Sequence, residues 1–572
     1  MQRVSVRGSQ QVETLSPIET GCFRIAVPLV LFSLCLVLAN PGTAEAQTAI
    51  IVMSGEASPD GNGTFISFEV PTVNANGEVA FVASLTGTAL GTTDSLGIYL
   101  ASADSINALV RSGNPAPDGN GQFALFTANY SGANQVVALS DAGIASFGGS
   151  LTGTSGPPGD LSGLFTANIA DGVTQLVRTG DPAPDGNGTF ASDDSSPPGL
   201  SFYGIDGSGR VPFFATFDGT SGGMMVPPDD HGAFRWEGGL IETLARAGDT
   251  VPGSTDIFED INLMLGISSN SAGQVALNTQ LFWDFMGGGM GPPADLNRLY
   301  VTDGNTIDDV VRSGVAIVDG NGSLVGIQEF VIGEDGMVAF IGQVGGSDSW
   351  LDDVPRLFMT DGSTLTQIAK QGALGPGETE FEWEYFKGFD VNSTHGVAFA
   401  ASLYRNAVPP DNRTSGIFIN DGGGITPLLR EGDPAPDGNG TFGDLAGPIQ
   451  MTSGGGIIFE ATLENTADPG FDSSGIFFID PDSEVHTVAR AGQALAGSTI
   501  YSAWFLCSTY LNGADIGRAG LNCINDAGQV PFVAGLASGS QGVFLWQSTG
   551  SSGIFSDGFE SGNALGWSAS VP

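Results

Sequence analysis

Eight copies of one unit, all in register, govern what this chain of 572 residues can fold into. The fullest copy of the opening phrase reads RTGDPAPDGNGTF (178–190), and nearly the same words return at 430–442. Repeats of this length each form one supersecondary unit that stacks on its neighbours, so we expect one large body. The glycine of the phrase recurs 58 to 68 residues apart, at Gly55, Gly113, Gly180, Gly248, Gly314, Gly372, Gly432 and Gly492.

Two further phrases keep step with the first. One has the form Asn-x-x-Gly-x-x-Ala-Phe, as in VNANGEVAFVASL (73–85), and the other is short, as in GIYL (97–100). In both, turn residues precede runs of apolar residues, which is typical of β-strands, and no helical periodicity follows the N-terminal region. The pattern of turn residues and apolar runs in each unit predicts about four strands. The sequence therefore predicts an all-β fold, an eight-bladed β-propeller of four-stranded antiparallel blades.

The ends of the repeat region predict how the ring closes. TAIIVMSG (48–55) copies the fourth strand of a unit, whereas the last unit stops after GVFLW (542–546), a copy of the third strand. If the N-terminal strand fills the gap in the last blade, no sheet edge stays exposed between the chain ends. An open β-solenoid would need neither feature, so we favour the closed ring.

The N-terminus has the pattern of a secretory signal. Residues 24–46, RIAVPLVLFSLCLVLANPGTAEA, combine a basic start, a short apolar run and a small-x-small cleavage site. An uncleaved anchor helix is the alternative. We divide the chain into a signal peptide (1–46), the propeller (47–548) and a Ser/Gly linker with a short tail (549–572). We expect an exported, extracellular or cell-surface protein, monomeric and without a membrane span in the mature chain.

The phrase from Asn74 to Phe81 resembles the NxxGxxAF motif of a family of bacterial exported tandem-repeat (choice-of-anchor) proteins. The match spans roughly residues 50–546. Two copies depart from it, since the phrase after Gly209 contains Val-Pro-Phe and His395 interrupts the sixth copy. The resemblance implies export and tandem repeats, and the family brings no activity with it.

The charge balance limits the partners. With 62 acidic and 18 basic residues the formal net charge is −44, which repels nucleic acid and anionic membranes. A carbohydrate or an extracellular protein remains a candidate partner. We therefore expect a binding or structural module, and a glycosidase-like hydrolase that uses loop carboxylates is the alternative. No catalytic residue can be chosen among so many acids.

The opening phrase connects the fourth strand of one blade to the first strand of the next, and we call it the joint. In a four-stranded meander the joints share a face with the loops between strands 2 and 3, which vary most between repeats. Variable loops on a rigid scaffold commonly carry binding. Packing of the aromatic side chains within their own loops is the alternative to ligand contact. The candidate binding residues are Trp283, Phe285, Trp350, Asp352 and Asp353.

One position of the joint holds a basic residue in seven repeats. Each side chain could be a clamp that pairs with carboxylates of the Asp181 or Asp185 type and with carbonyls. The alternative is a ring of cations that binds an anionic ligand. These residues are Arg111, Arg178, Arg246, Arg312, Lys370, Arg430 and Arg490.

The sequence Asp-Gly-Asn-Gly in the joint raises the possibility of calcium, because oxygen ligands spaced in this way can start a calcium loop. The third ligand and the bidentate Glu of such a loop are missing. A turn whose Asp and Asn bond local backbone is the alternative. Three repeats replace the sequence, which a turn tolerates. The five candidate ligands are Asp60, Asp118, Asp185, Asp319 and Asp437.

Two cysteines remain after the signal peptide, Cys507 and Cys523, and in an exported protein they predict one disulfide. Two buried free thiols are the alternative. The three histidines, His231, His395 and His486, stand in unrelated repeat contexts, so their spacing predicts neither a metal site nor a catalytic triad.

Overall fold

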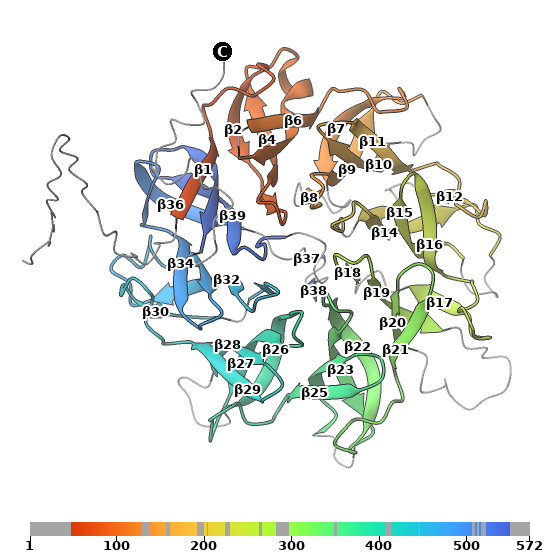
Figure 1. The fold of residues 1–572 in the computed structure, drawn as a ribbon, viewed down its shortest axis with the longest axis vertical. Helices are drawn as coiled ribbons and strands as arrows, with labels where there is room; N and C mark the ends of the chain where they lie inside the picture. Colours follow the sequence, from red (N-terminus) through yellow and green to blue (C-terminus); the bar gives the residue numbers. More distant parts are fainter. Residues whose placement is uncertain are drawn as a thin grey trace, which may run out of the picture. The chain divides into compact units, whose positions relative to one another are not determined.

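In the computed structural model the described residues form an eight-bladed β-propeller (Figure 1). The chain divides into two units, Met1–Glu45 and Ala46–Pro572. The predicted signal peptide and tail lie outside the described residues. The described part contains no helix with the length and hydropathy of a membrane span. The described residues are 47–103, 105–127, 137–155, 161–191, 199–202, 204–222, 229–261, 266–281, 297–347, 352–405, 413–445, 447–505, 510–511, 514–515 and 522–548.

Blades 1 to 4 follow one pattern, in which two short segments together form the first strand and both pair with the second strand. Blade 1 comprises β2 (Thr64–Phe68), β3 (Thr72–Val73), β4 (Val79–Thr86), β5 (Leu96–Ser102) and β6 (Ser105–Arg111), with the 3-10 turn η1 (Gly91–Asp94). Blade 2 comprises β7 (Gln122–Thr127), β8 (Ala138–Leu139), β9 (Ala145–Thr152), β10 (Ser162–Asn168) and β11 (Gly172–Arg178). Blade 3 comprises β12 (Thr189–Phe190), β13 (Leu200–Phe202), β14 (Val211–Asp218), β15 (His231–Glu237) and β16 (Leu240–Arg246). Blade 4 comprises β17 (Phe258–Ile261), β18 (Ile267–Ser269), β19 (Val275–Leu281), β20 (Asn297–Thr302) and β21 (Ile307–Arg312).

Blades 5 and 6 have four strands each, and blades 7 and 8 have additional short segments. Blade 5 comprises β22 (Ser323–Ile332), β23 (Val338–Gly345), β24 (Pro355–Thr360) and β25 (Leu365–Lys370). Blade 6 comprises β26 (Glu382–Val391), β27 (Val397–Tyr404), β28 (Arg413–Asn420) and β29 (Ile425–Arg430). Blade 7 comprises β30 (Thr441–Phe442), β31 (Ile449–Met451), β32 (Ile457–Glu464), β33 (Ser474–Ile479) and β34 (Val485–Arg490). Blade 8 comprises β35 (Ala494–Leu495), β36 (Ser498–Trp504), β39 (Gln529–Leu536), β40 (Gln541–Gln547) and β1 (Gln47–Met53), and β37 (Tyr510–Leu511) pairs separately with β38 (Ala514–Asp515).

The first strand of a blade is less regular than the sequence indicates. It runs unbroken in blades 5 and 6 but carries two register shifts there, for example between Leu324 and Gly326. In blade 1 a shift follows Phe65, and Pro71 lies between the two segments. A bulge leaves one residue out of the pairing and bends the strand, and Pro has no N–H to donate. These features interrupt the hydrogen-bonding ladder without changing the predicted blade.

The N-terminal strand closes the ring, as the sequence predicts. Figure 1 shows β1 beside the last blade, and its residue Thr48 lies opposite Trp546 of β40. The Ser54 N–H continues the pairing by donating to the Gln541 carbonyl at 2.7 Å. The Gln541 side chain then accepts the Phe68 N–H at 2.8 Å, so it ties the closing blade to blade 1. The first and last strands of the propeller therefore pair without an exposed edge between them.

Two repeated aromatic residues stack in the interior of seven blades, and in blade 4 Leu277 takes the place of one of them. Phe81 of the Ala-Phe phrase lies directly opposite Tyr99 of the short phrase, and their rings stack with centroids 5.5 Å apart. Blade 6 repeats this with Phe399 and Phe418, also 5.5 Å apart. Each apolar cluster joins neighbouring blades, as where Val533 of blade 8 packs with blade 1. The repeated apolar residues thus bury both faces of a blade.

The Asn-x-x-Gly turns between the first and second strands link neighbouring blades. Asn74 is fully buried and donates its side-chain amide to the Ser140 carbonyl of blade 2 at 2.9 Å. Asn525 of blade 8 donates in the same way to the Asn74 carbonyl at 2.9 Å. These turns therefore stabilise the contact between neighbouring blades. The loops that vary between repeats lie at the other end of each blade, beside the joints.

Candidate functional site

Four of the seven basic residues of the joint pair with the Asp-Gly-Asn-Gly turn of the preceding joint. In these blades the guanidinium lies at the end of the fourth strand and reaches that turn. In blade 6, Arg430 lies 3.1 Å from Glu378 of a joint that lacks this turn. In the four blades with the turn the arginine side chain is only 2–6% exposed, which disfavours the hypothesis of a cationic ring for anionic ligands. The pairs are Arg111–Asp60 at 2.5 Å and, at 2.6 Å, Arg178–Asp118, Arg246–Asp185 and Arg490–Asp437.

The same guanidinium groups also bond backbone. Arg246 donates to the carbonyl of Asn187 at 2.7 Å, and Arg490 does so to that of Asn439 at 2.7 Å. The Asp181-type carboxylate serves the arginine's own backbone, because the Arg178 N–H donates to it at 2.8 Å. A buried guanidinium with several acceptors fixes the turn in position and direction.

Blades 4 and 5 differ from the predicted clamp. Arg312 is exposed, and its cross-strand neighbour Arg298 lies 3.2 Å from Asp256 of this blade's joint. In blade 5, Arg356 pairs with Asp319 at 2.6 Å, and Lys370 pairs with Asp352 instead. The prediction that the joint residue itself contacts the turn is therefore wrong in blade 5.

The short phrase carries the sequence signal for this exchange. Its first residue is Gly in six blades, and in five of these the arginine of the fourth strand lies opposite that glycine. A Cβ at Gly416 would come 3.1 Å from Cδ of Arg430, for example. Blades 4 and 5 have Arg298 and Arg356 at this position, so the guanidinium reaches the joint from the third strand.

The asparagine of the joint fastens the variable loop of the same blade. In blade 1, Asn62 donates to Asp94 at 2.9 Å and accepts the Ala89 N–H at 2.8 Å. Burial by itself would raise the pKa of Asp94, but hydrogen bonds from Thr88 and Asn62 outweigh it and lower that pKa. Equivalent pairs are Asn187–Asp229 at 2.7 Å, Asn321–Asp352 at 3.2 Å and Asn439–Asp472 at 2.7 Å.

The five aspartates considered for calcium already use their oxygens. In Asp60, Oδ1 accepts the Asn62 N–H at 3.0 Å while Oδ2 holds the guanidinium of Arg111. The same turn contact is made by Asp118, Asp185, Asp319 and Asp437. A cation at these positions would have to displace a buried guanidinium, so the donor set fits a turn better than a calcium site.

The structure describes two of the five candidate binding residues, Asp352 and Asp353. Trp283, Phe285 and Trp350 lie outside the described residues. Asp352 bonds Asn321 and pairs with Lys370, and hydrogen bonding to Lys370 is the main cause that lowers its pKa. Asp353 accepts the Ser347 hydroxyl at 2.6 Å. Both aspartates thus hold their own loop, which leaves fewer lone pairs for a ligand.

Cys523 is disulfide-bonded, so the free-thiol alternative is wrong for this residue. Cys507, its predicted partner, lies outside the described residues. Cys523 is buried, and its N–H donates to the Gln450 side chain of blade 7 at 3.0 Å. The bond therefore lies where blade 7 meets blade 8.

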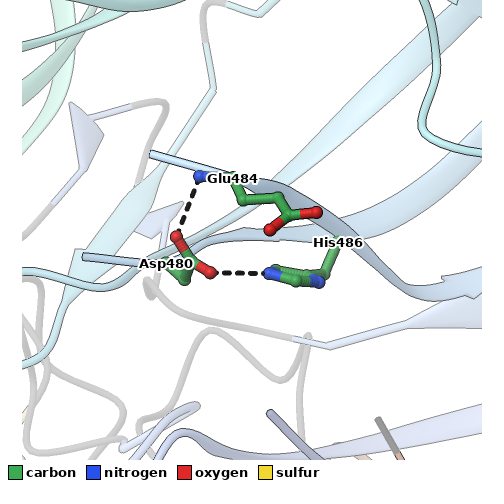
Figure 2. Close-up of side chains that lie close together, drawn as sticks. All are labelled: Asp480, Glu484 and His486. Carbon is green, nitrogen blue, oxygen red and sulfur yellow. Dashed lines mark hydrogen bonds and ion pairs between the residues drawn. The ribbon is translucent and has the colours of Figure 1, made fainter. Parts of the chain in front are cut away.

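A cluster of different chemistry lies at the hairpin between β33 and β34, where Asp480, Glu484 and His486 converge (Figure 2). Their nearest ligand atoms all lie within 4.8 Å of one another. His486 Nε2 is 2.8 Å from Asp480 Oδ2, and both side chains are less than a fifth exposed. The spacing of the three histidines did not indicate this cluster, because His486 is the only histidine in it. The signal was a histidine two residues after Glu484 in a turn that begins with Asp480.

A second histidine bridges two blades. His231 Nδ1 lies 2.8 Å from Asp230, and its Nε2 lies 2.9 Å from Asp260 of blade 4. Burial would lower the pKa of His231, but hydrogen bonds and charge from Asp260 and Asp230 outweigh it and raise the pKa. This arrangement favours an imidazolium between two carboxylates.

Burial raises the pKa of several glutamates, among them Glu460 and Glu69. The position of Glu460 is occupied by the apolar residues Val82 and Val533 in blades 1 and 8. The Glu460 side chain still reaches solvent. A raised pKa suits proton donation, although neither glutamate belongs to the clusters described above.

The fold and the joint face define the class of this protein as an eight-bladed β-propeller with clamped joints and anchored loops. Within that class, the chain belongs to the family of unknown function DUF7453, whose sequence profile matches residues 37–198, 129–286 and 205–550. No curated protein matches the chain in sequence.

Solved structures give distant likenesses. The β-propeller domain of the Trilobed protease from Pyrococcus furiosus is 12% identical with a TM-score of 0.24, covering 64% of this chain and 96% of that one. A PL25 ulvan lyase is 10% identical with a TM-score of 0.29, covering 75% and 93%. Trypanosoma rangeli sialidase is 11% identical with a TM-score of 0.24, covering 66% and 59%. These likenesses carry no argument about activity.

Proposed function

We propose that this protein is an exported binding scaffold that presents its variable loops on the joint face. One observation carries the proposal: the repeated asparagine of the joint bonds the variable loop of its own blade, as in Asn62–Asp94 and Asn439–Asp472. A joint asparagine that recurs between blades thus anchors a loop whose sequence differs between blades. Loops held in this way keep their shape before a partner arrives, which reduces the entropy lost on binding.

The net charge of the chain limits the classes of partner that it can bind. A net charge of −44 repels polyanions, so a carbohydrate without acidic groups or an extracellular protein with a basic surface suits this face. The predicted signal peptide and the resemblance to exported repeat proteins support a location outside the cytoplasm. A monomer is sufficient for this role, because the asparagine of the joint anchors the variable loop within its own blade, as in blades 1, 3, 5 and 7.

The test uses the mature chain, residues 47–572, applied to a glycan array and to a panel of extracellular proteins. In a matched variant, residues 282–296 are replaced by the short loop 87–95 of blade 1. We expect the variant to lose binding while the thermal midpoint stays within a few degrees. If binding survives replacement of the variable loop in every blade, the joint face is not the binding surface.

An extracellular hydrolase is the second candidate, and Glu460 is the observation that favours it. Burial raises the pKa of Glu460, and a raised pKa is the direction that favours proton donation to a leaving group. A panel of glycosidase substrates tests this, with Glu460→Gln as the variant and Glu464→Gln, on the same strand, as the control. Turnover that only Glu460→Gln abolishes would replace the scaffold proposal.

A further inference from the structure

We propose that Asp480, Glu484 and His486 form a binding site for a divalent transition-metal ion of the zinc type, on the hairpin between β33 and β34. Figure 2 shows the Asp480 carboxylate facing the His486 imidazole, with the Glu484 carboxylate beside the imidazole. Their nearest ligand atoms lie within 4.8 Å of one another. The site is separate from the joint face, because loops between strands 3 and 4 lie at the opposite end of a blade from the joints.

The hairpin register brings these residues together. His486 lies directly opposite Phe478, and Ile479 lies opposite Val485, so the chain turns between Asp480 and Glu484. The imidazole packs against the Phe478 ring, with centroids 6.3 Å apart. The strand pairing therefore fixes His486 before any ion arrives, and an ion loses less binding free energy to ordering the ligands.

The turn does not explain the cluster by itself. Asp480 Oδ1 already stabilises the turn, since it accepts the N–H groups of Asp482 and Glu484 at 3.0 and 2.8 Å. The turns of blades 4 and 5 do the same with Asp303 and Asp361. In these two blades the same function is achieved without a histidine, so the turn does not require His486.

Two donor atoms are left for an ion. Asp480 Oδ2 and His486 Nε2 lie 2.8 Å apart, where a single proton joins them. An ion would replace that proton and bond both atoms. The exposed Glu484 carboxylate, for which the described residues provide no hydrogen-bond partner, would be the third ligand after a change of rotamer.

The ligand set indicates the kind of ion. One imidazole nitrogen and two carboxylate oxygens suit Zn²⁺ and its first-row neighbours, whereas Ca²⁺ prefers an all-oxygen shell of six to eight ligands. Because Glu484 is exposed, water would complete the coordination. Such an open set of three ligands predicts weaker binding than a closed four-ligand structural site.

The experiment is a calorimetric titration of the chelator-treated mature chain with ZnCl₂, in excess MgCl₂ to occupy unspecific acidic surface. We expect one zinc ion per chain, and at least tenfold weaker binding in Glu484→Gln and His486→Ala. The control is His395→Ala, which removes an exposed histidine paired with Asp335. This control should bind zinc as the natural chain does.

Glu484→Gln guards against a folding artefact, because this exposed side chain contributes no described contact to the fold. Absorption of bound Co²⁺ in the visible range provides a second readout, and its bands should change in the same two variants. Zinc binding equal to that of the natural chain in both variants would overturn the proposal. So would a natural chain that takes up no zinc.

Discussion

Arg490 Nη1 lies 2.6 Å from both carboxylate oxygens of Asp437, although 53 residues separate the two along the chain. The same guanidinium donates to the carbonyls of Asn439 and Asp472 at 2.7 and 3.0 Å. One side chain therefore holds the joint at the start of blade 7 and the variable loop of that blade. The repeated joint is thus a device that fixes loops.

Replacing Arg490 tests the clamp. Arg490→Ala removes the ion pair to Asp437, whose side chain is 44% exposed, and takes the guanidinium donor away from two carbonyls. We expect the free energy of unfolding to fall by about 2 kcal/mol, because the carbonyls lose their donor in a largely buried setting whereas Asp437 is solvated by water. Denaturant unfolding followed by tryptophan fluorescence measures the change. Arg413→Ala is the control, because this arginine is 66% exposed and its pairing with Glu384 should add less than about 1 kcal/mol.

Reduction should loosen the contact between blades 7 and 8. Because Cys523 is disulfide-bonded, dithiothreitol is expected to lower the thermal midpoint, with a loss of roughly 2–4 kcal/mol that is typical of one disulfide. Differential scanning calorimetry with and without the reductant measures this. In Cys523→Ser the reductant should have no further effect. Equal midpoints of the natural chain in both buffers would contradict the prediction.

The stability contributed by His231 should depend on pH. Its pKa is raised above 6.5 in the folded protein by Asp260 and Asp230, which outweigh burial. A raised folded-state pKa gives stability that is fully present below pH 6.5 and is lost as pH rises through the folded-state value. The midpoint difference between the natural chain and His231→Gln should therefore shrink from pH 6 to pH 9. A difference that grows with pH would reverse the assigned sign.

The closing strand should be essential to the ring. Val52 in β1 is 1% exposed and packs with Val533 and Val543 of blade 8. Val52→Asp buries an unpaired charge, so we expect a large fall in the thermal midpoint and rapid protease cleavage near the N-terminus. Gln47→Asp at the exposed start of the same strand is the control. If Val52→Asp resists protease as the natural chain does, closure by β1 is not needed.

Calcium should leave the protein unchanged. The Asp-Gly-Asn-Gly carboxylates are held by backbone and guanidinium, as in Asp60 with Asn62 and Arg111. We expect 1 mM CaCl₂ to shift the thermal midpoint by less than about 1 °C beyond a NaCl control of equal ionic strength. A rise of several degrees would show that calcium binds the folded state and would restore the calcium hypothesis.

The periodic features of the sequence were sufficient to predict the scaffold. The phrases that contain Phe81 and Tyr99 recur in register, so the strands and the blade they form followed from spacing. The spare N-terminal strand predicted the closure that Thr48 and Trp546 now display. The clamp could be expected from Arg178 and Asp185-type residues, although Asp118, the partner of Arg178, belongs to the preceding joint.

What the sequence alone determined is therefore the repeat, the number of blades and the closed ring, because strand period and turn chemistry are local and recur eight times. Only the tertiary structure decided that Arg356 replaces Lys370 at Asp319 and that His486 meets Asp480 and Glu484. Such contacts depend on cross-strand register and on which side chain fits the space above a glycine. Those quantities arise from packing between strands, which no single repeat encodes.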